Sequence, residues 1–262
     1  MTKKTFFSII ITVYKNFEYI EEAVRSVINQ DYNYFEVIIV DTFYNRQREN
    51  KFKKKFRKNK INFNYLKFHN KFRAAGARNY GVNKSSGEYI VFLDDDDKFK
   101  KNYLKNLNKV IIKKRYDLLV SEFSEFSNNK ILKRIEITKK FNIHDLYVYN
   151  PFVLPSNIAI KKETFLFLKG FNTNFFYSSD KLLLIDIIKE KKSYHVLKKN
   201  LVLRRVHKKN WTKNYKIIFE NNLKFFKNFI GEFILITKIR FLKKLVILYL
   251  KYVTTYLFKR SF

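Results

Sequence analysis

Short apolar runs alternate with segments of helical periodicity through the first half of this chain. Four of these runs are strand candidates, and each is followed by enough residues to cross back over a sheet. They cover residues 6–12, 35–40, 61–66 and 89–93. Strands joined by helical crossovers lie parallel. The pattern therefore predicts an α/β fold with a mostly parallel central sheet and flanking helices.

Helices are expected between and after these runs. Apolar residues from Ile20 to Ile28 fall on one face at helical spacing. Residues 74–86 fit a helix that ends at Gly87, where a left-handed residue is expected. Residues 100–115 form a further predicted helix, and residues 118–123 a further strand.

The second half is less regular. Pro151 and Pro155 are the only two prolines and mark a loop. Helical patterns return over residues 180–189 and from Tyr215 onward. With 262 residues, 46% of them hydrophobic, the chain can bury one substantial core. We expect one main domain with a C-terminal helical extension.

The chain is strongly basic, since 55 Lys and Arg against 23 Asp and Glu give a formal net charge of +32. Such a field attracts polyanions, among them nucleic acid, anionic lipid and phosphorylated small molecules. The absence of cysteine excludes disulfides and thiolate metal sites and suits a cytoplasmic location. The apolar stretch 6–13 lacks a cleavage site, and stretch 229–258 is interrupted by charges. Neither a signal peptide nor a spanning helix is expected.

Asp94, Asp95, Asp96 and Asp97 directly follow the fourth apolar run. In an open parallel sheet, ligands bind where strands end. Four adjacent carboxylates repel one another unless a cation neutralises them, and all-oxygen ligands favour Mg²⁺ or Mn²⁺ over zinc. The sequence therefore predicts a divalent metal site. The alternative is a solvated acidic turn that caps a helix starting near Lys98.

Two further residues gain a second interpretation from this cluster. Asp41 ends the second run, where a lone Asp is commonly a turn or cap residue. Arg78 lies on the predicted helix before the acidic run, where a lone Arg is commonly a surface charge. Together with the cluster, Arg78 could instead pair with a diphosphate or with the carboxylates.

Five segments, in this order, resemble the inverting nucleotide-sugar glycosyltransferases of family 2. They are SIIITVYKN (8–16), FEVIIVD (35–41), AAGARNYGVNKSSGEYIVFLDDDD (74–97), GF (170–171) and SSDKLLL (178–184). The resemblance implies a Rossmann-like GT-A catalytic domain over residues 1–212. Its donor-nucleotide half would be 1–117 and its acceptor half 118–212, followed by a basic, amphipathic helical extension over 213–262.

The resemblance also implies a donor site, with a UDP-sugar expected as the donor. The residues implied to line it are Thr12, Tyr14, Asp41, Arg78, Asp95, Arg205 and His207. Thr12, Tyr14 and Asp41 would line the pocket of the base, and Asp95 would face the ribose. Arg205 and His207, in the segment LRRVHKKNW (203–211), would contact the donor phosphates. A solvated basic turn is the alternative for that segment.

Asp94-x-Asp96 matches the DxD element of the family, so the resemblance implies that Asp94 and Asp96 hold Mn²⁺ or Mg²⁺. Asp180 lies where the family places the base that removes the proton of the acceptor hydroxyl in an inverting transfer. The alternative is that Asp180 caps its helix. The implied acceptor is a saccharide or lipid-linked hydroxyl in the synthesis of a cell-surface polysaccharide or lipooligosaccharide.

Three positions depart from the family pattern. Thr42-Phe43-Tyr44 stands where many members have a second Asp and then Gly-Ser. Ser179 replaces the Glu that usually precedes the base, and Thr12 replaces a usual proline. The first departure bears on the choice of base and donor. We still expect an active enzyme.

In the extension, a helical wheel over residues 238–251 places Arg240, Lys243, Lys244 and Lys251 within an arc of about 100°. Two placements are open. Residues 238–259 could lie on an anionic membrane surface, at the inner face of the plasma membrane, with this basic arc toward the lipid. Alternatively, they pack on the catalytic domain with a solvated charged face.

Two other functions compete with sugar transfer. The net charge fits a nucleic-acid-binding protein, but the charge is spread along the chain and no such motif is present, so no nucleic-acid partner is expected. A metal-dependent nucleotidyl or phosphoryl transferase would need a second set of carboxylates. Asp117, Glu122 and Glu125 are the candidates for that set.

Overall fold

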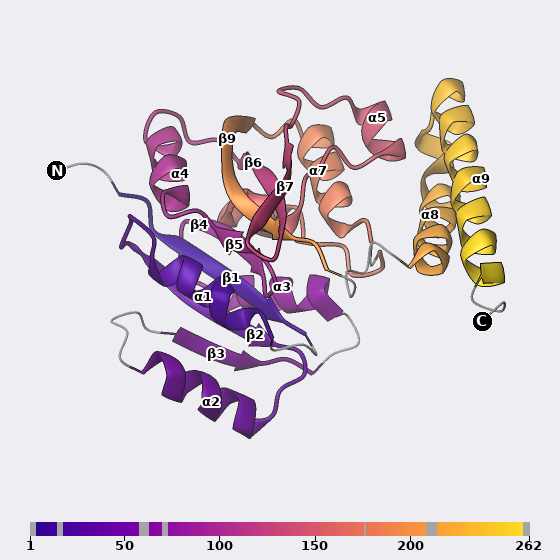
Figure 1. The fold of residues 1–262 in the computed structure, drawn as a ribbon. Coiled ribbons are helices and arrows are strands. Elements are labelled where there is room, and N and C mark those ends of the chain that lie inside the picture. Colours follow the sequence, from indigo (N-terminus) through magenta and orange to yellow (C-terminus); the bar gives the residue numbers. More distant parts are fainter. Residues whose placement is uncertain are drawn as a thin grey trace.

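The computed structural model describes residues 4–14, 18–57, 63–69, 73–175, 177–207 and 214–258. Helices cover a twisted central sheet, and two long C-terminal helices stand side by side at one end of the molecule (Figure 1). The strands are β1 Phe7–Val13, β2 Phe35–Asp41, β3 Phe63–Lys67, β4 Tyr89–Asp94, β5 Lys98–Phe99, β6 Leu118–Ser127, β7 Lys130–Ile135, β8 Ile158–Lys161 and β9 Tyr194–Arg205. The α-helices are α1 Ile20–Ile28, α2 Arg46–Phe56, α3 Arg73–Asn83, α4 Tyr103–Ile111, α5 Ile143–Val148, α6 Lys162–Phe167, α7 Ser179–Lys189, α8 Tyr215–Phe229 and α9 Leu235–Phe258.

The sheet has the strand order β3-β2-β1-β4-β8-β6-β9-β5, with β7 paired to β6. Strands β3, β2, β1 and β4 are parallel. Strand β8 enters antiparallel to both β4 and β6, so the second half of the sheet is mixed. The predicted α/β fold is confirmed, and its purely parallel part is the half built from the four apolar runs.

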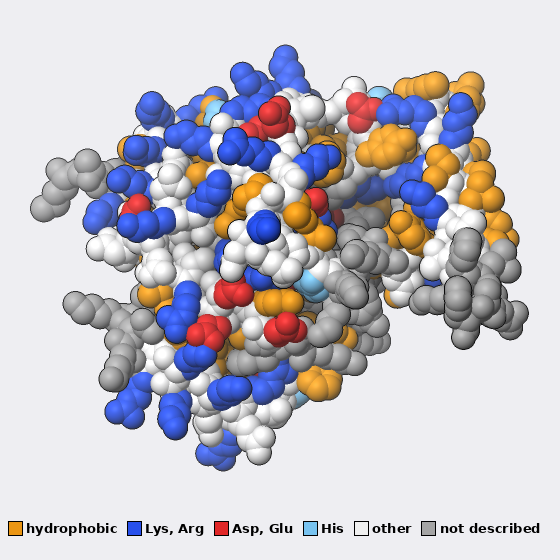
Figure 2. Space-filling view, viewed as in Figure 1, with side chains coloured by type: hydrophobic (Ala, Val, Ile, Leu, Met, Phe, Trp, Pro, Cys, Tyr) orange, Lys and Arg blue, Asp and Glu red, His pale blue; other side chains and the backbone are white. Residues whose placement is uncertain are grey.

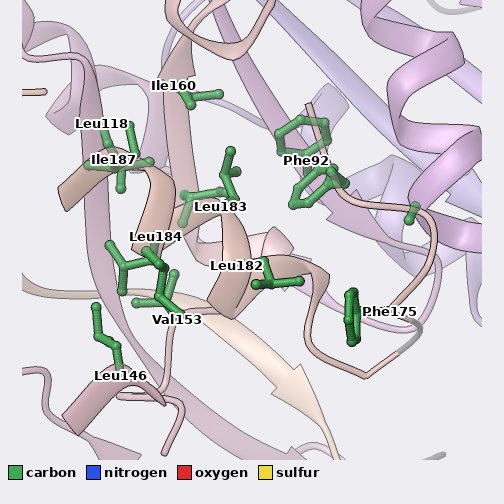
Figure 3. Close-up of a cluster of buried hydrophobic side chains, with 14 of the residues drawn as sticks. Phe92, Leu118, Leu146, Val153, Ile160, Phe175, Leu182, Leu183, Leu184 and Ile187 are labelled. Carbon is green, nitrogen blue, oxygen red and sulfur yellow. The ribbon is translucent and has the colours of Figure 1, made fainter. Parts of the chain in front are cut away.

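Each central strand contributes to two hydrophobic cores because successive side chains point to opposite faces. In β1, Ile10 belongs to the core that contains residues of α3 and α7, whereas Ile9 and Ile11 belong to the core that contains residues of α1 and α4. Figure 3 shows the first core, in which Leu182 and Leu183 of α7 lie over the sheet. Helix α7 is therefore held in place by its buried apolar side chains.

Gly87 does not have the left-handed conformation that the sequence led us to expect. Helix α3 ends earlier, at Asn83, and Gly170 is the glycine with positive φ among the described residues. A Cβ atom at Gly87 would lie 2.4 Å from the backbone nitrogen of Ser8. Gly87 is needed because the chain passes close to β1, where no side chain fits.

The acidic run does not cap a helix. Lys98 begins the two-residue strand β5, which pairs with β9, and α4 starts only at Tyr103. The alternative in which Asp94–Asp97 cap a helix near Lys98 is therefore wrong. The carboxylates instead occupy the tight turn between β4 and β5.

The C-terminal extension forms a helical hairpin, α8 and α9, with a short 3-10 turn at Ile230–Glu232. The rings of Phe225 and Phe241 stack across it with centroids 5.9 Å apart. Arg240 forms an ion pair of 2.7 Å with Asp145 of α5, and Lys244 donates a hydrogen bond of 2.6 Å to the carbonyl of Val148. Two members of the predicted basic arc thus face the main domain.

Candidate active site

The ends of β1 and β4 bring the first candidate residues together. Thr12 lies opposite Asp94 in the parallel pairing of the two strands. One residue beyond β1, the backbone nitrogen of Tyr14 donates a hydrogen bond of 3.1 Å to Oδ2 of Asp95. These neighbours come from segments of the chain 81 residues apart, so the parallel register is what assembles this edge.

The acidic turn is surrounded by cationic side chains. Arg78 of α3 forms a close ion pair with Asp94. Arg205, at the end of β9, donates from its backbone nitrogen to Oδ1 of Asp97 at 2.9 Å and from Nε to the carbonyl of Asp96 at 2.9 Å. His207 Nε2 lies 2.9 Å from Asp96 Oδ2. The structure thus gathers Arg78, Arg205 and His207 around the cluster.

The carboxylates of the turn are destabilised in their ionised forms. Burial, with the charge of Asp96 beside it, raises the pKa of Asp95 to about 8. Burial and the charge of Asp94 likewise raise the pKa of Asp96, and burial raises that of Asp97 well above its usual range. A ligand cation would relieve this repulsion, since an opposite charge favours the ionised carboxylate.

A second group of residues, which the sequence analysis did not single out, supports Arg205. Glu22 of α1 forms ion pairs with Arg205 at 2.9 Å and with Lys98 at 3.0 Å. The guanidinium of Arg205 lies 4.2 Å from the ring centroid of Tyr19 and 4.5 Å from that of Phe126. Contacts with both rings and with Glu22 therefore help to hold the arginine against the acidic turn.

Asp41 is placed differently from the other candidates. Its side chain is fully buried and accepts hydrogen bonds from Tyr65 Oη at 2.7 Å and from the backbone nitrogen of Phe43 at 2.9 Å. Arg48 of α2 lies 3.6 Å from it and donates to the carbonyls of Phe43 at 2.8 Å and Tyr14 at 3.0 Å. Asp41 therefore holds the loops around the expected base pocket, through Arg48 and Tyr65.

Asp180 lies in the first turn of α7. Its Oδ2 accepts a hydrogen bond of 3.1 Å from Asn150, and its Oδ1 accepts one of 2.7 Å from the backbone nitrogen of Lys181. Burial raises the pKa of Asp180 to about 6, although the Lys181 bond and the charge of Arg78 act in the opposite direction. The structure therefore links Asp180 electrostatically to Arg78, which also pairs with Asp94. Ser178, not Asp180, is the N-cap residue.

Among the described residues, no group of three or more His, Cys, Asp or Glu side chains forms a protein-only metal site. Mg²⁺ and Mn²⁺ in nucleotide enzymes usually take only one or two protein ligands, together with phosphate oxygens and water. Asp96 offers the carboxylate oxygens that these ions prefer, with the His207 imidazole 2.9 Å from it, whereas the carboxylate of Asp94 is engaged by Arg78.

The carboxylates required by a two-metal phosphoryl transferase are engaged elsewhere. Asp117 accepts hydrogen bonds from the backbone and hydroxyl of Ser193. Glu122 and Glu125 form ion pairs with a lysine and an arginine of β9.

The fold is that of GT-A glycosyltransferases. Staphylococcus aureus TarS, solved with UDP-GlcNAc, matches with a TM-score of 0.64 and 19% identity, covering 83% of this chain and 66% of that one. A mannosyltransferase of Pyrobaculum calidifontis, solved with GDP-Man and Mn²⁺, matches with a TM-score of 0.67 and 17% identity, covering 88% of this chain and 65% of that one. At these identities the likeness concerns the fold alone.

Residues 8–181 match the family described as Glycosyl transferase family 2, and the chain belongs to this family. A β-1,3-glucosyltransferase of Campylobacter jejuni that acts on GalNAc(5)-diNAcBac-PP-undecaprenol is 27% identical over 208 residues, 71% of this chain and 61% of the relative. The glycosyltransferase GlyG of Streptococcus pneumoniae is 25% identical over 173 residues, 60% of this chain and 57% of the relative. The chain thus spans less than two thirds of each relative.

Proposed function

We propose that this protein transfers a sugar from a UDP-sugar to an acceptor hydroxyl, with inversion at the sugar carbon. The observation that carries the proposal is the convergence of Asp96, His207 and two arginines on the turn at the end of β4. Carboxylate, imidazole and guanidinium groups together suit a metal-bound diphosphate. TarS was solved with UDP-GlcNAc, which makes that compound the first donor to test.

In the proposed complex, Asp96 and His207 would hold Mn²⁺ or Mg²⁺, and Asp94, oriented by Arg78, would add negative charge beside them. The ion would offset the charge that develops on the departing diphosphate. Arg205 points at the same turn and supplies a fixed positive charge. Thr12 and Tyr14 border the nucleoside, Asp95 faces the ribose, and Asp41 shapes the base pocket from behind.

Asp180 serves as the general base. The acceptor oxygen attacks the anomeric carbon from the face opposite the donor phosphate, the bond from that carbon to the phosphate oxygen breaks, and the acceptor proton passes to Asp180. A base is most effective when its pKa lies near the working pH. Burial raises the pKa of Asp180 to about 6, so the carboxyl is ionised at neutral pH and still binds a proton better than an ordinary aspartate.

Titration of the protein with UDP, with and without Mn²⁺, tests the donor site. We expect binding that requires the metal and that is lost in Asp96→Ala. Asp31→Ala, a change of an exposed carboxylate paired only with Lys101 among the described contacts, is the matched control. Metal-independent binding, or unchanged binding in Asp96→Ala, would contradict the assignment of the metal site.

We further propose that the acceptor is a saccharide or lipid-linked hydroxyl at the cytoplasmic face of the membrane, and that α9 lies on this surface. In the described part of the chain, no helix combines the length and apolarity that a membrane span requires. Helix α9 contains no acidic residue, and its outward face is apolar, with Leu242, Val246 and Leu250 48%, 58% and 56% exposed. Figure 2 shows hydrophobic side chains along the outer edge of the molecule, over α9.

The packing of α9 against α5 differs from the predicted membrane placement, in which the whole basic arc faces the lipid. Because Arg240 and Lys244 face α5, the apolar row would enter the membrane and the exposed Lys243 and Lys251 would meet anionic headgroups. Co-sedimentation with vesicles of phosphatidylglycerol and phosphatidylcholine tests it. We expect binding that Val246→Asp abolishes and that Leu132→Asp, on β7 at a similar exposure, leaves intact. Equal loss in both variants would contradict the proposal.

A further inference from the structure

The residue after Asp180 is a buried lysine that the proposed reaction does not use. Lys181 is 3% exposed. Its Nζ donates a hydrogen bond of 3.1 Å to the carbonyl of Tyr147 in α5. The same atom lies 3.6 Å from the ring centroid of Phe225 in α8 and 5.9 Å from that of Phe241 in α9. One ammonium group therefore connects the first turn of α7 to three other helices.

Burying this ammonium group is unfavourable. Among the described residues, no carboxylate forms an ion pair with it, and a buried charge without such a partner carries a large desolvation cost. Burial, with the nearby charge of Lys244, lowers the pKa of Lys181 well below its usual range, although Asp180 acts in the opposite direction. The aromatic faces offset part of the cost. The next residues, Leu182 and Leu183, are also buried, so the surroundings would accept an apolar side chain.

What the lysine supplies and a leucine would not is a directed bond to α5. The end of α5 and the loop after it take part in three hydrogen bonds with α7 and α9. Lys181 bonds to the carbonyl of Tyr147, Lys244 of α9 bonds to the carbonyl of Val148, and Asn150 bonds to the Asp180 carboxylate. Asp180 and Lys181 are thus both bonded to the segment 147–150, and Lys244 of α9 is bonded to the same segment.

The bond from Lys181 to Tyr147 constrains the position of the first turn of α7, and the bond from Asn150 constrains the direction of the Asp180 carboxylate. If the Lys181 bond is removed, the first turn of α7 keeps its apolar packing but loses its register against α5. Asn150 is itself fixed by two hydrogen bonds to the backbone of Val153, at 2.8 and 2.9 Å. It cannot follow a displaced Asp180 without breaking them.

We propose that Lys181 is a positioning residue for Asp180, and that it makes the α8–α9 hairpin part of the active-site framework. Its ammonium group, held against Phe225 and Phe241 and bonded to Tyr147, sets the first turn of α7 so that the Asp180 carboxylate stays on Asn150. The inference rests on the proposed function, in which Asp180 removes the acceptor proton.

The test compares Lys181→Met with wild type and with Leu184→Met, which puts the same side chain at an equally buried position of α7. Amide hydrogen exchange of residues 178–183 is expected to rise about tenfold in Lys181→Met, because the Leu182 N–H to Ser178 bond opens more readily. Release of UDP from UDP-GlcNAc with Mn²⁺, where water replaces the acceptor, should fall about tenfold or more in kcat. The Kd for UDP should stay within about twofold.

The conservative change Lys181→Arg keeps the charge and the donor groups, so its kcat should lie closer to that of the wild type. Wild-type exchange and wild-type kcat in Lys181→Met would overturn the inference. If that variant does not fold, Phe225→Leu removes the aromatic face and leaves the lysine, and the same changes are expected. Wild-type values in Phe225→Leu would then overturn it.

The inference and the proposed function fail in different ways. If Asp180→Asn releases UDP at the wild-type rate, Asp180 is not the base, and the positioning role is overturned with it, whatever the exchange of Lys181→Met. If Asp180→Asn is inactive while Lys181→Met matches the wild type in both measurements, the proposed function stands and only the role of Lys181 is overturned.

Discussion

His207 Nε2 lies 2.9 Å from Asp96 Oδ2, although the two residues are 111 positions apart in the chain. Strand β9 makes this contact possible, because it ends at Arg205, where the chain reaches the turn after β4. An imidazole and a carboxylate at this spacing can share one ion, and this relationship supports the first prediction.

His207→Ala is expected to weaken Mn²⁺-dependent UDP binding by about tenfold to a hundredfold or more, because removal of even an outer-shell partner of a metal ligand costs that much. Calorimetric titration of UDP with and without Mn²⁺ measures this. His195→Gln is the control, since His195 stacks on Tyr116. If the two variants bind alike, His207 has no part in holding the metal.

The second prediction concerns the pH dependence of turnover. Burial raises the pKa of Asp180 to about 6, so the carboxyl is neutral below that pH and ionised above it. A base must be ionised, and kcat should therefore rise with pH and reach half its plateau at about pH 6. Asp180→Asn should lower kcat by about 10²-fold to 10⁴-fold, the usual contribution of a general base.

Asp186 provides a demanding control for that prediction. It lies in the same helix, and burial raises its pKa to about 6 as well. Asp186→Asn should leave the acid limb of the profile unchanged. Loss of the acid limb in Asp186→Asn, together with its retention in Asp180→Asn, would show that the titrating group is Asp186 and would contradict the prediction.

The third prediction concerns Arg48, which ties together the loops after β1 and β2. Arg48→Met leaves the fully buried Asp41 without its guanidinium partner, and removal of one member of a buried pair costs about 3 kcal/mol. We expect that loss in chemical denaturation and weaker UDP binding, because the Tyr14 and Phe43 carbonyls lose their common donor. Arg46→Met, an exposed arginine of the same helix, should change neither quantity.

Much of the parallel half of the fold could be predicted from sequence. Apolar runs with residues on both faces of a strand leave few other arrangements, and β1, β2 and β4 lie within one or two residues of the predicted bounds. In the second half, the predicted strand 118–123 and helix 180–189 correspond to β6 and α7. Strands β7, β8 and β9 could not be predicted, because β7 is mostly exposed, β8 has only 4 residues and β9 contains several charged residues. The partners of β8 and β9 also lie far away in the sequence. The single helical pattern after Tyr215 gave no sign of the hairpin, which depends on contacts between aromatic rings.

The candidate site shows the same division. The acidic turn and Asp180 were predicted because they follow recognisable patterns, and Arg78 was predicted together with them. Glu22, Arg48 and Lys181 were missed because each is a common charged residue among many others in a basic chain. Their roles depend on burial and on partners from distant segments, which neither composition nor local spacing records.

The last prediction separates two glycines. In Gly87→Ala the new Cβ would lie 2.4 Å from the nitrogen and 2.4 Å from Oγ of Ser8. Relief requires moving the backbone of β1 and breaking the 2.7 Å bond from Gly87 N to Ser8 Oγ. Overpacking of this kind costs about 1–3 kcal/mol in a rigid core. Gly231→Ala, where the new Cβ meets nothing within 4 Å, should lose no stability. Urea denaturation measures both variants, and equal midpoints would show that β1 yields to the extra methyl group.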